Sequence, residues 1–268
     1  MRLSRAGVTY YLKIHQNNPD LPFLVLMHGF MGSGEVFKPH ISELSVFANP
    51  VTIDLCGHGK TIALAQSARF ETGEQTEDLK SILERLQFSE FYLHGYSMGG
   101  RLALQFAVKY PEMLRGLILE STHCGITDST ERKTRRRTDQ KRAEAILENY
   151  SNFLEEWIEM PLFASAKKSN IYETVMQQQN PDRMAASLLG FGAGVMPAVC
   201  DKLNQMPVST LLIAGSKDQK YVEKMSEMAH LIDQAKFEIV QPAGHRVHSD
   251  NPGEFIKIIN QFISEDYG

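Results

Sequence analysis

The chain has 268 residues, and its 28 Lys and Arg against 32 Asp and Glu give a net charge of −4. A chain of this length forms one large domain or two small ones, and it buries enough surface to fold without a metal or a disulfide framework. With 43% hydrophobic residues, the composition excludes collagen-like, disordered and coiled-coil classes. The mild acidity argues against nucleic-acid binding through overall basic charge.

The three cysteines, Cys56, Cys124 and Cys200, are far apart and form no CxxC pair. Their number and spacing argue against a disulfide framework and a cysteine zinc site, and they favour a reducing compartment. Residues 1–16 lack the apolar core of a secretory signal, and apolar runs such as Phe23–Met27 are far shorter than the roughly 20 residues that cross a bilayer. We therefore predict a cytoplasmic protein that does not insert into membranes.

In the first half of the chain, short apolar runs alternate with segments whose apolar residues repeat at helical spacing. This alternation predicts a parallel sheet with helices on both faces. In chain order, we predict strands at Val8–Ile14, Phe23–Met27 and Val51–Leu55, a helix at Glu74–Leu86, a strand at Phe91–Tyr96, a helix at Arg101–Tyr110 and a strand at Leu117–Glu120.

The alternation stops between residues 124 and 199, where only helical patterns occur. We interpret 124–199 as a helical cap inserted into a single α/β domain that spans 1–268. The cap would cover the carboxyl edge of the sheet, where parallel sheets bind their ligands. Beyond it, we predict a strand at Val208–Ala214, a helix at Val222–Leu231, a strand at Phe237–Val240 and a helix at Glu254–Ile263.

The most informative motif is Gly95-Tyr96-Ser97-Met98-Gly99, which fits the pattern G-x-S-x-G. The pattern alone arises by chance in about one in ten chains of this length. Here it joins a predicted strand to a predicted helix, as a nucleophile elbow requires. Glycines permit the tight turn that exposes the serine hydroxyl, so we predict Ser97 as the catalytic serine.

A catalytic serine needs a histidine to take its proton and a carboxylate to orient that histidine, in the chain order Ser, acid, His. Asp218 and His245 follow predicted strands and complete that order. Asp218 also suits a turn or helix N-cap, and His248 is a rival to His245. We prefer His245 because it directly follows the Ala-Gly turn. After the strand Phe23–Met27 comes His28-Gly29-Phe30, and the backbone N–H groups of Phe30 and Met98 are the predicted oxyanion hole.

These elements, together with DLCGHG after the third strand, resemble the α/β-hydrolase superfamily over nearly the whole chain. That fold hosts hydrolases and lyases, so the superfamily alone does not identify the reaction. The segments GYSMGGRLAL, LEST-x-x-GI, W-x-x-x-PLF, GSKDQKYV and GHRVH further resemble the MenH family, the 2-succinyl-6-hydroxy-2,4-cyclohexadiene-1-carboxylate synthases. By this resemblance, Ser97, Asp218 and His245 are catalytic, and the substrate-binding residues are Tyr96, Arg101, Arg135 and Trp157.

The resemblance implies a lyase of menaquinone biosynthesis that eliminates pyruvate from a small polycarboxylate and needs no metal or organic cofactor. Three features of this chain depart from the family. A further cap arginine expected near 176–178 is replaced by Met176-Gln177-Gln178, and Arg183 or another basic residue is a candidate substitute for it. The usual proline before the cap-opening glycine is Cys124, and the usual DLPGHG is DLCGHG.

The basic run from Glu131 to Arg142 carries a net charge of +5, from seven basic and two acidic residues. It suits either a solvated helical face or a site for an anionic substrate. Trp157 suits either cap packing or substrate contact. The alternative function is a serine hydrolase acting on an ester, thioester or C–C bond of a carboxylated substrate. A non-enzymatic interaction module is disfavoured by the complete Ser-Asp-His set. No oligomeric state follows from the sequence.

Overall fold

A computed structural model describes residues 1–65, 67–164, 170–233 and 235–267. Its centre is an eight-stranded sheet with the order β1-β2-β4-β3-β5-β6-β7-β8. The pairs β1·β2 and β2·β4 are antiparallel, and the remaining pairs are parallel. The strands are β1 (Arg2–Arg5), β2 (Val8–Ile14), β3 (Phe23–Met27), β4 (Asn49–Asp54), β5 (Phe91–Tyr96), β6 (Leu114–Glu120), β7 (Thr210–Gly215) and β8 (Ala235–Val240).

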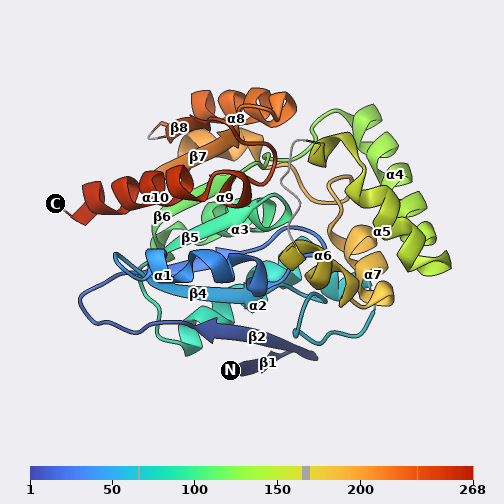
Figure 1. The fold of residues 1–268 in the computed structure, drawn as a ribbon, viewed down its shortest axis with the longest axis horizontal. Coiled ribbons are helices and arrows are strands. Elements are labelled where there is room, and N and C mark those ends of the chain that lie inside the picture. Colours follow the sequence, from blue (N-terminus) through green and yellow to red (C-terminus); the bar gives the residue numbers. More distant parts are fainter. Residues whose placement is uncertain (66, 165–169, 234, 268) are drawn as a thin grey trace.

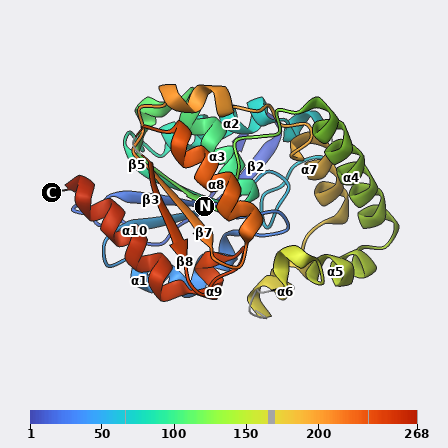
Figure 2. The ribbon, with the colours of Figure 1, turned by 90° about the horizontal axis from the view of Figure 1, so that it is seen from above.

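Helices cover both faces of the sheet (Figures 1 and 2). One face packs against α2 (Thr72–Arg85), α3 (Met98–Lys109) and α8 (Gln219–Leu231), and the other against α1 (Ile41–Leu44) and α10 (Pro252–Tyr267). A short helix, α9 (Val247–Asp250), follows β8. Short 3-10 helices lie at Gly34–His40, Ser67–Phe70, Pro111–Met113, Pro161–Phe163 and Cys200–Gln205.

Strand β5 illustrates why the apolar runs form central strands. All six of its residues are buried, and Leu93 belongs to one core cluster whereas the adjacent Tyr92 belongs to the other. Successive side chains of a strand point to opposite faces, so a strand with helices on both faces is apolar throughout rather than alternating.

The predicted fold class is confirmed: the sheet is mostly parallel and has helices on both faces. The predicted bounds of β2, β3 and β5 are those of the structure, and the other elements differ at their ends. The edge strand β1 has no predicted counterpart. Its four residues are half-buried or exposed and lack an apolar run, so only its pairing with β2 reveals it.

Among the described residues between β6 and β7, the α-helices are α4 (Ser129–Glu148), α5 (Tyr150–Ile158), α6 (Asn170–Gln177) and α7 (Pro181–Phe191). Figure 1 shows them grouped beyond one end of the sheet. The predicted limits 124–199 enclose all four, and we propose them as the limits of a cap. Within the described ranges, no helix is long and apolar enough to cross a membrane.

One expectation about the cysteines is wrong. Cys124 and Cys200 form a disulfide, with their Cα atoms 5.0 Å apart, although 76 residues separate them in sequence. They meet because the cap segment leaves β6 and returns to β7, and these strands are neighbours in the sheet. The Val199 N–H also donates to the Cys124 carbonyl oxygen at 2.8 Å. The cysteines therefore no longer favour a reducing compartment, and a cytoplasmic location stays a prediction.

Candidate active site

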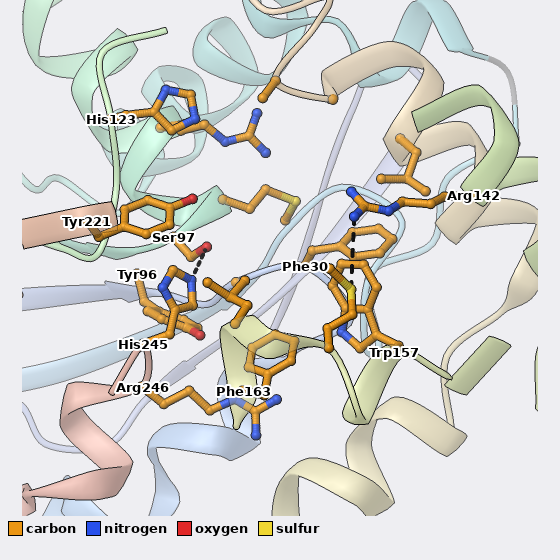
Figure 3. A pocket seen from close by; sticks show the side chains of 18 of the residues that line it. Phe30, Tyr96, Ser97, His123, Arg142, Trp157, Phe163, Tyr221, His245 and Arg246 are labelled. Carbon is orange, nitrogen blue, oxygen red and sulfur yellow. Dashed lines mark hydrogen bonds between the residues drawn. The ribbon is translucent and has the colours of Figure 1, made fainter. Parts of the chain in front are cut away.

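Ser97 occupies a sharp turn between β5 and α3. Its backbone has φ 52° and ψ −106°, a backbone conformation that residues other than glycine rarely adopt. The flanking glycines make the turn possible. A Cβ at Gly95 would lie 2.5 Å from the Gly99 carbonyl oxygen, and one at Gly99 would lie 2.5 Å from the His28 carbonyl oxygen. The turn directs the Ser97 hydroxyl into a cavity rather than into the sheet (Figure 3).

A hydrogen-bonded chain joins Ser97, His245 and Asp218. His245 Nε2 lies 3.0 Å from Ser97 Oγ, and His245 Nδ1 lies 2.6 Å from Asp218 Oδ2. Because a carboxylate only accepts, Nδ1 carries the proton and Nε2 is free to accept from the serine hydroxyl. Asp218 stands at the N-cap position of α8, but its side chain caps no helix N–H. The carboxylate is therefore directed at His245 instead of at the helix.

The rival histidine, His248, belongs to a different buried cluster. Its Nδ1 lies 2.7 Å from Glu120 Oε1, and its Nε2 contacts the Tyr172 hydroxyl. His94 Nε2 approaches the same carboxylate at 3.1 Å. Burial by itself raises the pKa of Glu120, but the two histidines outweigh it and hold that pKa below its usual range. The cluster joins β5, β6 and α9 to cap helix α6. The Ser97 N–H donates to the Glu120 carbonyl oxygen at 2.8 Å, but among the described residues no side chain of the cluster hydrogen-bonds the Ser97 hydroxyl, which pairs with His245.

The backbone N–H groups of Phe30 and Met98 have no hydrogen-bond acceptor in the part of the chain that the structure describes. Met98 begins α3, and the first N–H groups of a helix lack partners within it. Both residues line the same cavity as Ser97. The two donors thus remain available to an oxygen atom beside the serine, as an oxyanion hole requires.

The cavity has a volume of about 460 Å³ and lies between the carboxyl edge of the sheet and the cap helices. It is lined by all nine residues predicted as catalytic, oxyanion-binding or substrate-binding. These residues are Phe30, Tyr96, Ser97, Met98, Arg101, Arg135, Trp157, Asp218 and His245.

Cationic side chains converge on one end of this cavity. Arg101 is buried, donates to the Phe191 carbonyl oxygen at 3.1 Å and lies over the Phe191 ring. Burial, with a smaller contribution from the charge of Arg135, lowers the pKa of Arg101 to about 10. The same two causes lower the pKa of Lys220. Arg135 therefore repels both Arg101 and Lys220 electrostatically, and an anionic ligand bound between them would reduce that repulsion.

The basic run lies on α4, and only two of its seven basic residues reach the cavity. Arg135 and Arg142 are two helical turns apart, and both approach Asp139, at 2.8 and 3.6 Å. Arg142 also lies over the Trp157 ring, 5.4 Å from its centre, so Trp157 contributes to cap packing as well as to the cavity wall. The other five basic residues of the run do not line the cavity. Arg132 and Arg136 donate to backbone carbonyl oxygens in 194–196. The remaining three are exposed: Lys133, Arg137 and Lys141.

With this geometry in view, comparisons with known proteins identify the family. A family model described as the alpha/beta hydrolase fold matches residues 22–252. The chain belongs to the α/β-hydrolase family. A Bacillus subtilis protein named "Putative 2-succinyl-6-hydroxy-2,4-cyclohexadiene-1-carboxylate synthase" is 35% identical over 247 residues, which cover 90% of each chain.

Two solved structures extend the comparison. The structure of MenH from S. aureus superposes with a TM-score of 0.90 and 31% identity, over 97% of this chain and 99% of the other. A thermophilic esterase from Thermogutta terrifontis, solved with malate bound, has a TM-score of 0.86 and 25% identity over the full length of both chains. The resemblance to MenH inferred from the sequence is thus confirmed.

This α/β-hydrolase also has cavity residues that the sequence analysis did not single out. Lys220 and Tyr221 follow Asp218, and Arg246 follows His245, so adjacency to a predicted site residue at a strand end was the available signal. His123 precedes the disulfide cysteine at the opening of the cap. Burial, and then the charge of Arg101, hold the pKa of His123 well below its usual value, so this imidazole is neutral.

The suggested substitute for the cap arginine does not reach the site. Arg183 directs its guanidinium at the Thr61 carbonyl oxygen, 3.4 Å away, and does not line the cavity. Met176 lines the cavity with an apolar side chain, whereas the next two residues are exposed.

Proposed function

We propose that this chain is a carbon–oxygen lyase of menaquinone biosynthesis. Its substrate would be 2-succinyl-5-enolpyruvyl-6-hydroxy-3-cyclohexene-1-carboxylate, and its products pyruvate and 2-succinyl-6-hydroxy-2,4-cyclohexadiene-1-carboxylate. The observation that carries the proposal is a Ser97–His245–Asp218 hydrogen-bonded chain opening into a cavity with converging arginines. The names of the Bacillus subtilis relative and of the S. aureus structure support this reaction.

The arginines favour a substrate with several carboxylates. A guanidinium pairs a carboxylate through two parallel hydrogen bonds, and Arg101 and Arg135 present such groups to the cavity. A neutral ester would leave the buried Arg101, which forms no ion pair among the described residues, without a counter-charge. The substrate-binding residues that we propose are Tyr96, Arg101, Arg135 and Trp157.

Proton removal begins the proposed reaction. His245 Nε2 accepts the Ser97 hydroxyl proton, and the serine oxygen removes the proton from the ring carbon that bears the succinyl group. Asp218 holds the Nδ1–H of His245 and stabilises the imidazolium that forms. Ser97 thus acts as a base and does not attack a carbonyl carbon.

The electron pair from this C–H bond forms a double bond within the ring. The existing ring double bond shifts by one position, and the C–O bond to the enolpyruvyl group breaks. The enolate of pyruvate leaves and takes up the proton held by the His245 imidazolium, which restores the neutral histidine. Negative charge that develops on the succinyl ketone oxygen would be stabilised by the N–H groups of Phe30 and Met98.

The decisive measurement is pyruvate release from the enolpyruvyl substrate, followed with a coupled lactate dehydrogenase assay. We expect Ser97→Ala to lower kcat by several orders of magnitude. Ser187→Ala is the matched control, because Ser187 is a buried serine of the same cavity whose hydroxyl contacts Met98 Sδ and not His245. Near wild-type turnover by Ser97→Ala would refute the proposed role of the serine.

A hydrolase is the second candidate, because the same hydrogen-bonded chain suits acyl transfer and the esterase from Thermogutta terrifontis has this fold. Hydrolysis of p-nitrophenyl esters separates the two functions. Rapid ester cleavage without any pyruvate release would establish the hydrolase and exclude the lyase.

A further inference from the structure

Arg246 lies at the active site between β8 and α9, directly after His245. Two aromatic rings of the cap segment enclose its guanidinium, whose carbon is 4.4 Å from the centre of the Phe163 ring and 4.1 Å from that of Tyr172. The residue is only 8% exposed, yet it lines the cavity. The two rings therefore hold the guanidinium at the wall of the cavity.

Within the described ranges, no ion pair joins this buried cation to a carboxylate, and its buried Nε has no hydrogen-bond acceptor. Its polar neighbour is the Tyr96 hydroxyl, which is neutral because burial raises the pKa of Tyr96 more than Arg246 lowers it. Arg135 and Arg142, by contrast, both approach Asp139. Burying an unpaired charge costs free energy, so we expect Arg246 to bind an anion from outside the chain.

The position of Arg246 differs from that of the other cavity cations. Burial raises the pKa of Tyr221, and the charges of Arg101 and Arg135 offset part of that rise. The charge of Arg246 instead offsets part of the rise in the pKa of Tyr96. Figure 3 shows His123 and Tyr221 on one side of the Ser97–His245 pair and Arg246 on the other. Arg101, whose charge acts on both His123 and Tyr221, therefore lies on the opposite side of the serine from Arg246.

We infer that Arg246 binds a second carboxylate of the substrate, on the side of Ser97 opposite Arg101. The cavity would then select molecules with two carboxylates that span the serine. This inference rests on the proposed function for the identity of the substrate, but its test needs no turnover. Because Phe163 and Tyr172 come from the cap segment, this carboxylate subsite is complete only with the cap in place.

The test measures equilibrium binding by calorimetry to the Ser97→Ala protein, with three unreactive ligands that share one skeleton. 2-Succinylbenzoate carries both a ring carboxylate and a side-chain carboxylate. 4-Oxo-4-phenylbutanoate keeps only the side-chain carboxylate, and 2-acetylbenzoate keeps only the ring carboxylate. We expect the dicarboxylate to bind more tightly than either monocarboxylate.

Adding Arg246→Met should weaken 2-succinylbenzoate binding by about 10- to 100-fold, as expected for loss of a hydrogen bond to a charged group. It should weaken only one of the two monocarboxylates, the one whose carboxylate Arg246 contacts. Arg246→Lys keeps the charge but loses the planar fork, so its effect should be smaller. Arg137→Met is the control, because it removes the same charge from an exposed position on α4 that does not line the cavity.

Unchanged affinity for 2-succinylbenzoate in Arg246→Met would overturn the inference and leave Arg246 as a residue that only packs against the cap. A parent protein that binds the dicarboxylate no more tightly than the monocarboxylates would also overturn it. If Arg246→Met fails to fold, as judged by circular dichroism, Arg246→Lys decides: unaltered affinity overturns the inference, and weaker binding supports it. Failure of the proposed lyase function is a separate result, an absence of pyruvate release by the wild-type enzyme.

Discussion

The conformation of Ser97 predicts that removing its Cβ stabilises the protein. With φ 52° and ψ −106°, the serine has backbone angles that favour glycine. Residues held in such sparsely populated regions cost about 1–3 kcal/mol. Ser97→Ala removes the hydroxyl and keeps this strain, whereas Ser97→Gly removes both. The comparison of these two variants therefore isolates the strain of the turn.

The expected magnitude follows from two opposing effects. Relief of the strain favours the glycine variant, and the greater freedom of glycine in the unfolded chain disfavours it by about 0.4–1 kcal/mol. The net expectation is that Ser97→Gly unfolds with a free energy about 1 kcal/mol higher than Ser97→Ala. For a chain of this size, that difference raises Tm by about 2–4 °C.

Urea unfolding of both variants, followed by circular dichroism, measures the difference. Both variants should release pyruvate several orders of magnitude more slowly than the wild type, because neither carries the hydroxyl. A Ser97→Gly protein that is equal to or less stable than Ser97→Ala would refute the argument that the turn stores strain. Agreement would mean that stability is sacrificed at this position to present the serine to the cavity.

Three further predictions concern the disulfide, a buried histidine and the acid. Replacing both Cys124 and Cys200 by serine should lower the unfolding free energy by about 4 kcal/mol through the loop they close, and a urea midpoint insensitive to reductant would contradict this. Burial lowers the pKa of His28 to about 4, so the unfolded chain binds more protons below pH 6.5 and stability falls with acidification. The fall should be about 2 kcal/mol from pH 7 to pH 5, and His28→Gln should flatten the dependence of the urea midpoint on pH. Asp218→Asn should lower kcat for pyruvate release about 10,000-fold by favouring the wrong tautomer of His245, and a loss below tenfold would argue against its role.

The fold and the main site residues were largely predictable because their signals are local. Buried strands are short apolar runs, and the glycines around Ser97 mark a turn that few other residues allow. Asp218 and His245 were found by their places after strands, since the carboxyl ends of parallel strands meet at one edge. None of these arguments needs to know which side chains touch.

Other features required contacts between distant segments. The preference for His245 over His248 rested on a turn, whereas the structure separates them by their partners, Ser97 for one and Glu120 for the other. The pairing of Cys124 with Cys200 depends on β6 and β7 being neighbours, which cysteine spacing does not reveal.

The charge of the chain shows the same division. The sequence by itself determined a net charge of −4, a basic run in the cap and a serine at a strand end. Only the tertiary structure decided that Arg135 and Arg142 face the cavity while Arg137 faces solvent, and that Arg246 lies between two cap rings. The physical reason is that backbone conformation follows from local preference and periodicity, whereas the environment of a charge is set by side chains packed from segments far apart in the chain.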